Sequence, residues 1–290
     1  MSAEFKITPV LLNVGYAVHD KDWNWQDVQS PFTRIYYVTS GSARVKLPSG
    51  VVDLLPGNLY IIPAYTLHSD ICDGHFEHYY VHYYEEPMSE IQLFEDWTFP
   101  TMVPGTLMDR LLMERLCEMN PQLKLPQSDP TSYTNQHSIL NSIKYNTRKS
   151  FGDRVEAQGI AMQLISRFIR VGKPKLDVDD SRIQVVLAFI RKHLMEDLSL
   201  DILACKANLS KDHFIRIFKR ETGQTPSSYI VNRRIEYAQL LLATEDMSVK
   251  TIALQLGFED NSYFNRVFKK ITGLSPQQYR NQLFNKRQSK

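Results

Sequence analysis

Cysteine is scarce in this sequence, and it contains no long hydrophobic run. The three cysteines, Cys72, Cys117 and Cys205, are odd in number and widely spaced, so they fit neither a disulfide framework nor a Cys-x-x-Cys metal pair. We therefore expect reduced thiols. No apolar run approaches the roughly 18 residues that a membrane span needs, and residues 1–12 lack the basic start and apolar core of a signal peptide. We expect a cytoplasmic protein without membrane contact.

The charge of the chain is unevenly distributed. Its 290 residues, of which 43% are hydrophobic and 23% charged, are enough for two ordinary globular domains. Behind a formal net charge of +2, residues 1–175 carry 16 Lys and Arg against 19 Asp and Glu, whereas residues 182–290 carry 18 against 10. An acidic half joined to a basic half indicates a sensor linked to a nucleic-acid-binding domain.

Short strands separated by turns are expected between Phe5 and Tyr84. Residues 43–47 alternate apolar and polar side chains, and Pro48-Ser49-Gly50 and Pro56-Gly57-Asn58 mark turns on either side of residues 51–55. Many short strands at a spacing of about 8–12 residues favour a β-sandwich or a barrel.

After Thr106 the apolar spacing becomes helical, and two amphipathic helices are expected, packed on the strands or against a second subunit. Residues 120–135 between them are rich in Pro, Ser, Asn and Gln, which predicts a loop. The polar segment 172–181 predicts a linker, so the domains would be residues 1–171 and 182–290. The expected apolar stripes comprise Leu107, Leu111, Leu112, Leu116 and Met119, and Ile160, Leu164, Ile165, Phe168 and Ile169.

The basic half contains one stretch twice. The segment from Phe214 to Arg220 recurs 50 positions later from Phe264 to Lys270. Self-similarity at a fixed period indicates one supersecondary unit used twice. Each copy has the pattern of a helix-turn-helix motif, over about residues 199–221 and 248–272.

The turns and caps of the two motifs are visible in the sequence. Ser199 and Ser248 are expected to cap the first helices, and Ser210 to cap a second helix. Asn208 and Gly257 stand at the turns, where the backbone needs the left-handed conformation that Asn and Gly tolerate.

Each second helix divides into a buried and an exposed face. Phe214 and Phe218, like Phe264 and Phe268, lie on the face that must be buried. The opposite faces carry basic and amide side chains. Arg and Asn pair bidentately with guanine and adenine edges in the major groove, while Lys meets phosphates. A duplicated helix of this kind makes double-stranded DNA the expected partner.

A stiff spacer is expected between the two copies. Thr225-Pro226 starts a helix that continues to about Thr244. At 1.5 Å per residue this helix spans roughly 27 Å. That length is close to the roughly 34 Å of one DNA turn, so the two copies could enter successive major grooves on one face of the duplex.

Residues from about Arg182 to Gln282 resemble the DNA-binding domain of the AraC/XylS family of bacterial transcription regulators. The match is densest from Arg234-Ile235 through Gly257-Phe258 to Ser275-Pro276. It implies a sequence-specific transcription regulator, not an enzyme. We expect an activator that binds DNA as a homodimer, without a cofactor and with RNA polymerase as a further partner. The expected DNA-binding residues are Lys211, Asp212, His213, Ile215, Arg216, Lys219, Asn261, Ser262, Asn265, Arg266 and Lys269.

The N-terminal half is similar, less specifically, to the cupin-like barrel with which many members of that family bind a small effector. The similarity is carried by Gly41, Pro56-Gly57, Pro63 and His68. The resemblance implies a pocket for a small polar effector, and we expect a sugar, held by stacking rings and hydrogen-bonding side chains. The expected effector-binding residues are Trp25, Arg34, Tyr36, His68, Asp70, His78 and Tyr80.

A metal in the barrel is not expected. A metal-binding cupin has a His-x-His pair and a Glu, whereas Arg34 stands where the Glu would be and no His-x-His precedes it. His68, His78 and His82 are the one metal-binding set that remains open.

The sequence as a whole predicts an α+β multidomain chain, with a cupin-like β-barrel followed by helices and then an all-α domain with two helix-turn-helix motifs. Two alternatives stay open: a cupin enzyme fused to a DNA-binding segment, and a regulator whose barrel only dimerises. Bound metal would favour the first. Failure of small molecules to raise the melting temperature would favour the second.

Overall fold

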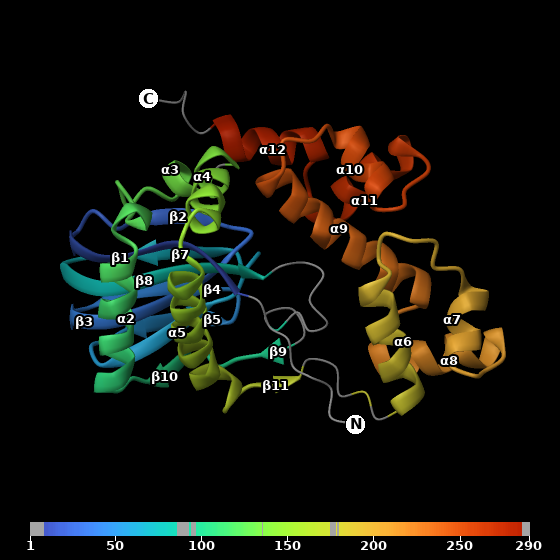
Figure 1. The fold of residues 1–290 in the computed structure, drawn as a ribbon, viewed down its shortest axis with the longest axis horizontal. Coiled ribbons are helices and arrows are strands. Elements are labelled where there is room, and N and C mark those ends of the chain that lie inside the picture. The colour runs from blue at the N-terminus through green and yellow to red at the C-terminus, as the bar shows by residue number, and fades with distance from the viewer. Residues whose placement is uncertain are drawn as a thin grey trace. The chain divides into compact units, whose positions relative to one another are not determined.

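The computed structural model describes residues 9–85, 93, 97–134, 136–174, 178 and 180–285. These residues form two compact units that divide between Lys173 and Pro174 (Figure 1). The first unit combines antiparallel strands with helices, and the second is helical. Across the described ranges, no helix is both long enough and apolar enough to cross a lipid bilayer.

The first unit contains two larger antiparallel sheets (Figure 1). One has the order β1 (Pro9–Asp20), β8 (His75–Glu85), β3 (Thr33–Gly41), β6 (Asn58–Ile62) and β10 (Met102–Pro104). The other has the order β2 (Trp25–Val28), β7 (His68–Ile71), β4 (Ala43–Leu47) and β5 (Gly50–Leu54). A short pair joins β9 (Trp97–Thr98) to β11 (Lys173–Pro174).

The two larger sheets share one hydrophobic core. Val38 and Ile62 of the first sheet cluster with Val45 and Leu54 of the second, and each is at most 1% exposed. No ladder joins the two sheets among the described strands. They are therefore the layers of a sandwich, and the expected closed cupin-like barrel is not confirmed.

The sequence predicted some of these strands and missed others. The expected strands at residues 43–47 and 51–55 correspond to β4 and β5. β1 and β7 were not singled out. β1 is buried along most of its length, so its sequence lacks the apolar–polar alternation of a strand with one solvent-exposed face.

Three longer helices complete the first unit: α2 (Leu107–Met119), α4 (Gln136–Thr147) and α5 (Phe151–Ile169). The stripe expected on α5 is confirmed, because Ile160, Leu164, Ile165 and Phe168 are buried. The segment between α2 and α4 holds a short 3-10 turn (Pro121–Leu123) and the four-residue α3 (Pro130–Tyr133). The sequence did not predict α4.

The stripe expected on α2 was wrong at its N-terminal end. Leu107 is 70% exposed and Leu111 47%, whereas Asp109 and Met113 are buried. The Asp109 carboxylate turns inward because it completes a capping box with Thr106. It also lies 3.4 Å from Nε of Arg167 on α5. The buried face of α2 is therefore rotated away from its most apolar side.

The second unit consists of seven helices among its described residues. They are α6 (Ser181–Lys192), α7 (Leu200–Lys206), α8 (Lys211–Thr222), α9 (Pro226–Thr244), α10 (Val249–Gln255), α11 (Asn261–Thr272) and α12 (Pro276–Asn285). In Figure 1, α7 and α8 lie beside one end of α9, and α10 and α11 lie beside the other.

The second unit has two hydrophobic cores, one for each motif. Tyr229 and Ile230, near the start of α9, belong to the core formed with α6, α7 and α8. Ile235 and Leu242, further along α9, belong to the core formed with α10, α11 and α12. The spacer expected between the two copies is therefore a structural part of both.

Candidate nucleic-acid interface and ligand pocket

The turns of the two helix-turn-helix motifs have the same backbone. Asn208 has φ of 55° and Gly257 has φ of 72°, so both are left-handed, as expected. In each copy the amide that follows donates to the carbonyl five positions earlier at 3.0 Å, from Leu209 in the first motif and from Phe258 in the second.

The buried faces of the second helices are duplicated ring by ring. In each copy two phenylalanines of the second helix and a tyrosine of the helix that follows form a chain of contacts. The second phenylalanine and the tyrosine have ring centroids 5.6 Å apart at 77° in the first copy, and 5.5 Å apart at 78° in the second. This edge-to-face geometry is favourable. The rings belong to Phe214, Phe218 and Tyr229, and to Phe264, Phe268 and Tyr279.

The ends of the second helices also match. Gly223 has φ of 77° and Gly273 has φ of 81°, and the two amides donate to the carbonyls of Lys219 and Lys269 at 2.9 Å. A left-handed glycine ends a helix without the steric cost that a Cβ would bring. α8 and α11 therefore end at equivalent C-cap glycines, and the chain leaves both helices in the same way.

The outward faces of α8 and α11 carry exposed cations. Arg216 and Arg266 are both solvent-accessible, and Lys219 and Lys269 are exposed. The Arg266 guanidinium lies over the ring of Tyr263, 5.5 Å from its centroid. Stacking of this kind limits the conformations of a long side chain while its donors stay in solvent.

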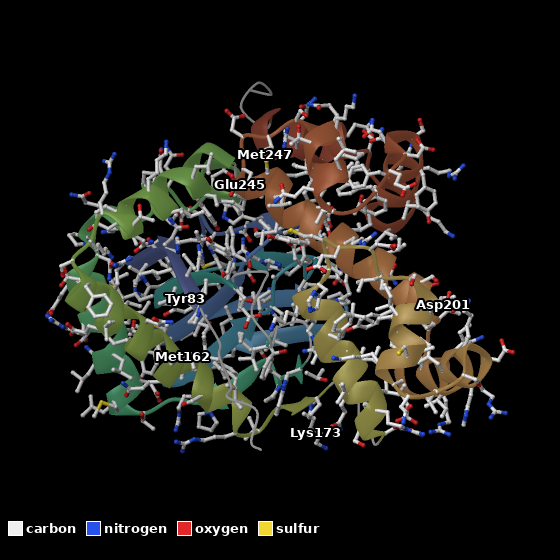
Figure 2. All side chains as sticks on the ribbon, turned by 45° about the vertical axis from the view of Figure 1, so that its right-hand side comes forward. Tyr83, Met162, Lys173, Asp201, Glu245 and Met247 are labelled. Atoms are coloured by element: carbon white, nitrogen blue, oxygen red, sulfur yellow. The ribbon has the colours of Figure 1, made fainter. Side chains whose placement is uncertain are left out.

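The other expected DNA-binding residues differ in exposure. Lys211 Nζ lies 2.8 Å from Oδ1 of Asp201 on α7, which is labelled in Figure 2. Ile215 is half-buried and packs against the core of the first motif rather than facing outward. Asp212 and Ser262 are exposed, and His213, Asn261 and Asn265 are half-buried.

The helix caps were predicted with one error. Ser199 and Ser248 cap α7 and α10 through their hydroxyls, as expected. Ser210 occupies the N-cap position of α8, but its side chain makes no capping hydrogen bond. In the second motif the cap is Asp260, whose carboxylate accepts from the amide of Ser262 at 2.7 Å. The turn there is one residue longer, so the cap falls on a different residue type.

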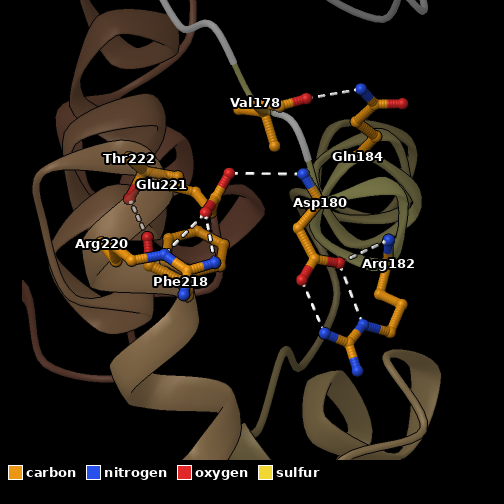
Figure 3. A network of polar contacts seen from close by, with 8 residues as sticks. All are labelled: Val178, Asp180, Arg182, Gln184, Phe218, Arg220, Glu221 and Thr222. Atoms are coloured by element: carbon orange, nitrogen blue, oxygen red, sulfur yellow. Dashed lines mark hydrogen bonds and ion pairs between the residues drawn. The ribbon is translucent and has the colours of Figure 1, made fainter.

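A polar network holds the start of the second unit against α8 (Figure 3). The amide of Asp180 donates to Oε2 of Glu221, in the last turn of α8, at 3.3 Å. The Asp180 carboxylate caps α6 and pairs with Arg182 at 2.6 Å. These contacts lower the pKa of Asp180 to about 2, with the Arg182 hydrogen bond as the main cause. The chain entering this unit is thus attached to the second helix of the first motif.

The first unit contains a pocket of about 440 Å³ beside β1 and β8. Three of the expected effector residues line it: Tyr36, His78 and Tyr80. Trp25, Arg34, His68 and Asp70 are not part of its wall as described. His82, which the sequence considered only as a metal ligand, lines it too. The sequence did not single out the remaining lining residues, which are Tyr16, Ala17, Val18, His19, Asp22, Trp23, Lys124, Leu125, Pro126, Gln127, Ser128 and Tyr133.

The pocket wall combines stacked rings with neutral imidazoles. His78 lies 4.6 Å from the ring of Phe76 and 5.5 Å from that of His19, centroid to centroid. Burial lowers the pKa of His78 well below its ordinary value, and it also lowers those of His19 and His82. Nδ1 of His78 has no hydrogen-bond partner among the described residues. A neutral imidazole in this position can donate to or accept from a polar ligand.

A loop closes one side of the pocket through a single tyrosine. The amide of Leu125 donates to the hydroxyl of Tyr80 at 2.7 Å. Residues 124–128 therefore lie against the pocket wall, although they come from the segment that the sequence predicted only as a loop.

Arg34, His68 and Asp70 form a separate buried cluster. Arg34 is 1% exposed and donates to Oγ of Ser30 at 2.6 Å. Nε2 of His68 lies 3.9 Å from Oδ1 of Asp70. Burial raises the pKa of Asp70 to about 7 although Arg34 acts to lower it. Burial also lowers the pKa of His68 to about 3, and Arg34 adds to this effect.

We expect replacement of Asp70 by Asn to remove a pH dependence of stability. Folded Asp70 keeps its proton up to about pH 7, whereas an unfolded Asp releases it near pH 4. The free energy of unfolding should therefore fall as the pH rises between these values, by on the order of 4 kcal/mol. Urea unfolding of both proteins at pH values from 4 to above 8 measures it. The stability of Asp70→Asn minus that of the parent should grow over this range and level off above pH 8. A difference that stays flat would contradict the assignment.

Within the described part of the chain, no three or more His, Cys, Asp or Glu side chains form a group that could hold a metal ion. The set His68, His78 and His82, left open by the sequence, is thus not brought together in that way.

Comparison with known proteins finds similarity in the second unit. A family model described as a helix-turn-helix domain matches residues 203–282. The chain is 44% identical over 93 residues to the MmsAB operon regulatory protein of Pseudomonas aeruginosa, covering 32% of this chain and 30% of that protein. It is 36% identical over 103 residues to the arabinose operon regulatory protein of Escherichia coli, covering 35% of each. The chain thus spans about a third of the length of these relatives, both of which are operon regulatory proteins.

Among solved structures, one similar chain is the DNA-binding domain of the transcriptional factor AdpA in complex with a target DNA. It is 32% identical, and the match covers 37% of this chain and 98% of that one, with a TM-score of 0.35.

Proposed function

We propose that this chain, whose residues 203–282 match a family model described as a helix-turn-helix domain, is an AraC-type transcription regulator that binds two adjacent sites on DNA. The observation that carries the proposal is the duplication itself. α8 and α11 share their buried rings, their left-handed stops and a solvent-accessible arginine at the same position. A duplicated scaffold that repeats such an arginine is expected for a domain that contacts one DNA duplex at two sites.

The two arginines take the specific role in this proposal. Arg216 and Arg266 would pair with guanine edges in the major groove, which arginine does bidentately. Lys219 and Lys269, one turn further along each helix, would meet phosphates. Asn265 would add an amide suited to adenine, which the first reader lacks because Ile215 packs against the core. The second motif should therefore discriminate more bases than the first.

The length of α9 supports successive grooves as the target. Its 19 residues give a rod of about 28 Å at 1.5 Å per residue. Successive major grooves on one face of B-DNA lie about 34 Å apart. The experiment is selection of duplexes from a random pool by the full chain, followed by mobility shift. Recovery of a site with two conserved boxes supports the proposal, and recovery of no preferred sequence would oppose it.

We further propose that the pocket of the first unit binds a small, neutral, polar organic effector, with a sugar as the leading class. Rings for stacking and neutral donors and acceptors occur together in its wall. The buried Nδ1 of His78, for which the described part of the chain offers no hydrogen-bond partner, supports a ligand hydroxyl at that point. Tyr36 and Tyr80 would contact the effector, together with His19 and Trp23.

A thermal-shift screen against monosaccharides, oligosaccharides and aromatic acids tests the effector. At a ligand concentration 100 times Kd the folded state gains about 2.7 kcal/mol, which raises Tm by several degrees. We expect a sugar to give this shift with the parent chain and His78→Leu to lose it. Tyr83→Phe, a buried change outside the pocket wall, should keep it. If no compound shifts Tm, the alternative of a regulator whose first unit only dimerises is favoured.

We propose that the chain acts as a homodimer and an activator. α2 and α5 pack together through the ion pair of Arg115 with Glu156 at 2.7 Å. The same two helices expose apolar side chains, among them Leu107, Met108 and Phe151 at 70, 60 and 75%. Exposed apolar side chains on neighbouring helices are suited to a second copy. Sedimentation tests the dimer, and transcription from a promoter carrying the selected site tests activation.

A further inference from the structure

Arg234, on α9, holds parts of both helix-turn-helix motifs with one guanidinium. Its Nε donates to the carbonyl of Leu194 at 3.0 Å and its Nη2 to that of Glu196 at 2.7 Å, both in the segment that leads into the first motif. Its Nη1 donates to the carbonyl of Gly257, in the turn of the second motif, at 3.0 Å. The guanidinium also lies 5.9 Å from the ring centroid of Phe258.

This contact explains why the two turns use different residues. Asn208 and Gly257 occupy equivalent left-handed positions. A Cβ added to Gly257 would lie 2.8 Å from Nη2 of Arg234 and 2.9 Å from its Cζ. A side chain at this position would therefore push the guanidinium away. Glycine is therefore favoured there by a neighbour from another helix as well as by the backbone angle.

Side-chain packing does not close the junction around Arg234. A pocket of about 250 Å³ opens beside it, with Met195, Leu198 and Leu254 among its lining residues. Each motif has its own hydrophobic core on its own part of α9. Tyr237, further along α9, packs against both cores. The empty space beside Arg234 adds no packing contacts, so the hydrogen bonds of Arg234 supplement α9 in fixing one motif against the other.

We propose that Arg234 is a positioning residue that sets the distance and angle between α8 and α11, so that both helices read their boxes at one spacing only. The inference rests on the proposed DNA-binding function. When two binding elements are held rigidly, the second box is reached at a high effective concentration, and this advantage falls when the connection loosens. Arg234 would therefore affect binding to two boxes together, and not to either box alone.

The first test replaces Arg234 by Met, which keeps the stem and removes all donors. The probes are the selected two-box duplex, two duplexes with one box scrambled, and one with a base pair inserted between the boxes. Lys192→Met, an exposed position on α6, is the control for lost charge. We expect Arg234→Met to bind the two-box duplex at least about tenfold more weakly and each one-box duplex within about twofold of the parent. The loss of affinity caused by the inserted base pair should be smaller for this variant than for the parent. Equal losses on all duplexes, or no loss, would overturn the proposal.

The second test keeps Arg234 and displaces it. Gly257→Asn introduces a residue that tolerates the left-handed backbone, as Asn208 does in the first motif, so backbone strain is controlled. Asn208→Gly is the reciprocal variant in the first motif. We expect Gly257→Asn to reproduce the two-box defect and Asn208→Gly to bind like the parent. If both variants bind like the parent, the positioning role of Arg234 is wrong, although the DNA-binding function stands. If the parent selects no two-box site, the function itself fails.

Discussion

Replacing both Arg216 and Arg266 by Ala is expected to abolish sequence-specific DNA binding. Each bidentate arginine–guanine pair contributes about 1–3 kcal/mol, so affinity for the selected site should fall by about 30-fold to 10⁴-fold. Both side chains reach solvent from helices whose opposite faces are fixed in separate cores. Their loss should therefore leave the fold intact. Competition mobility shift against a scrambled duplex measures the specificity ratio, and urea unfolding checks stability.

A paired lysine variant separates the base contacts from general electrostatics. Lys219→Ala with Lys269→Ala removes the same charge from the same two helices. If these lysines meet phosphates, the slope of log affinity against log salt should decrease by about two while the preference for the selected site persists. The assignment of the readers would be contradicted if the arginine variant kept the parent's ratio of specific to scrambled binding.

Replacing Phe268 by Ala should cost the second unit about 3–5 kcal/mol of folding free energy, because a fully buried aromatic ring leaves a cavity. Phe268 is 0% exposed and contacts both Phe264 and Tyr279 edge-on or tilted. Phe218→Ala should cost a similar amount through the first core, in which the equivalent ring is also 0% exposed. Urea unfolding measures both. Ile271→Ala, at a side chain 43% exposed on the same helix, is the control. The Ile271→Ala variant should lose less than about 1 kcal/mol of folding free energy.

The two aromatic variants also test the independence of the cores. Each should lose binding to its own box before it loses binding to the other, since Phe218 and Phe268 belong to different clusters. A loss from Phe268→Ala as small as that from Ile271→Ala would mean that the ring is not a core element.

The sequence predicted the second unit in detail because short-range rules determine its features. Spacings of three and four residues place Phe214 and Phe218 inside, and residue type alone places Asn208 and Gly257 at the turns. The duplication then checks each assignment against a second copy. Ser210 was mispredicted as a hydroxyl cap, because a serine at the right position does not guarantee the side-chain hydrogen bond.

The first unit was less predictable because its site depends on the pairing of distant strands. Tyr36, His78 and Tyr80 were predicted and line the pocket, while His19 and Trp23 were not. In β8 the alternation of side chains brings His78 and Tyr80 to one face. The neighbours of that face are set by the register of β1 on β8, which pairs Ala17 with His78. That strand register cannot be predicted from a single sequence.

The role of Arg234 was also beyond sequence reasoning. The partners of Arg234 are backbone carbonyls, which every residue has, so no side-chain pattern in the sequence predicts them. The one signal was the difference between Asn208 and Gly257 at equivalent turns. That difference became interpretable only from the fold, in which the guanidinium lies within 3.0 Å of the place that a Cβ on Gly257 would occupy.

The most direct test of two readers on one face of the duplex is a footprint of the full chain on its selected DNA, by methylation interference at guanine N7. The structure predicts two windows of interference in the major groove, centred about 10–10.5 base pairs apart, because α8 and α11 lie beside opposite ends of one 19-residue helix. A single window, or two windows about half a turn apart on opposite faces, would contradict this account.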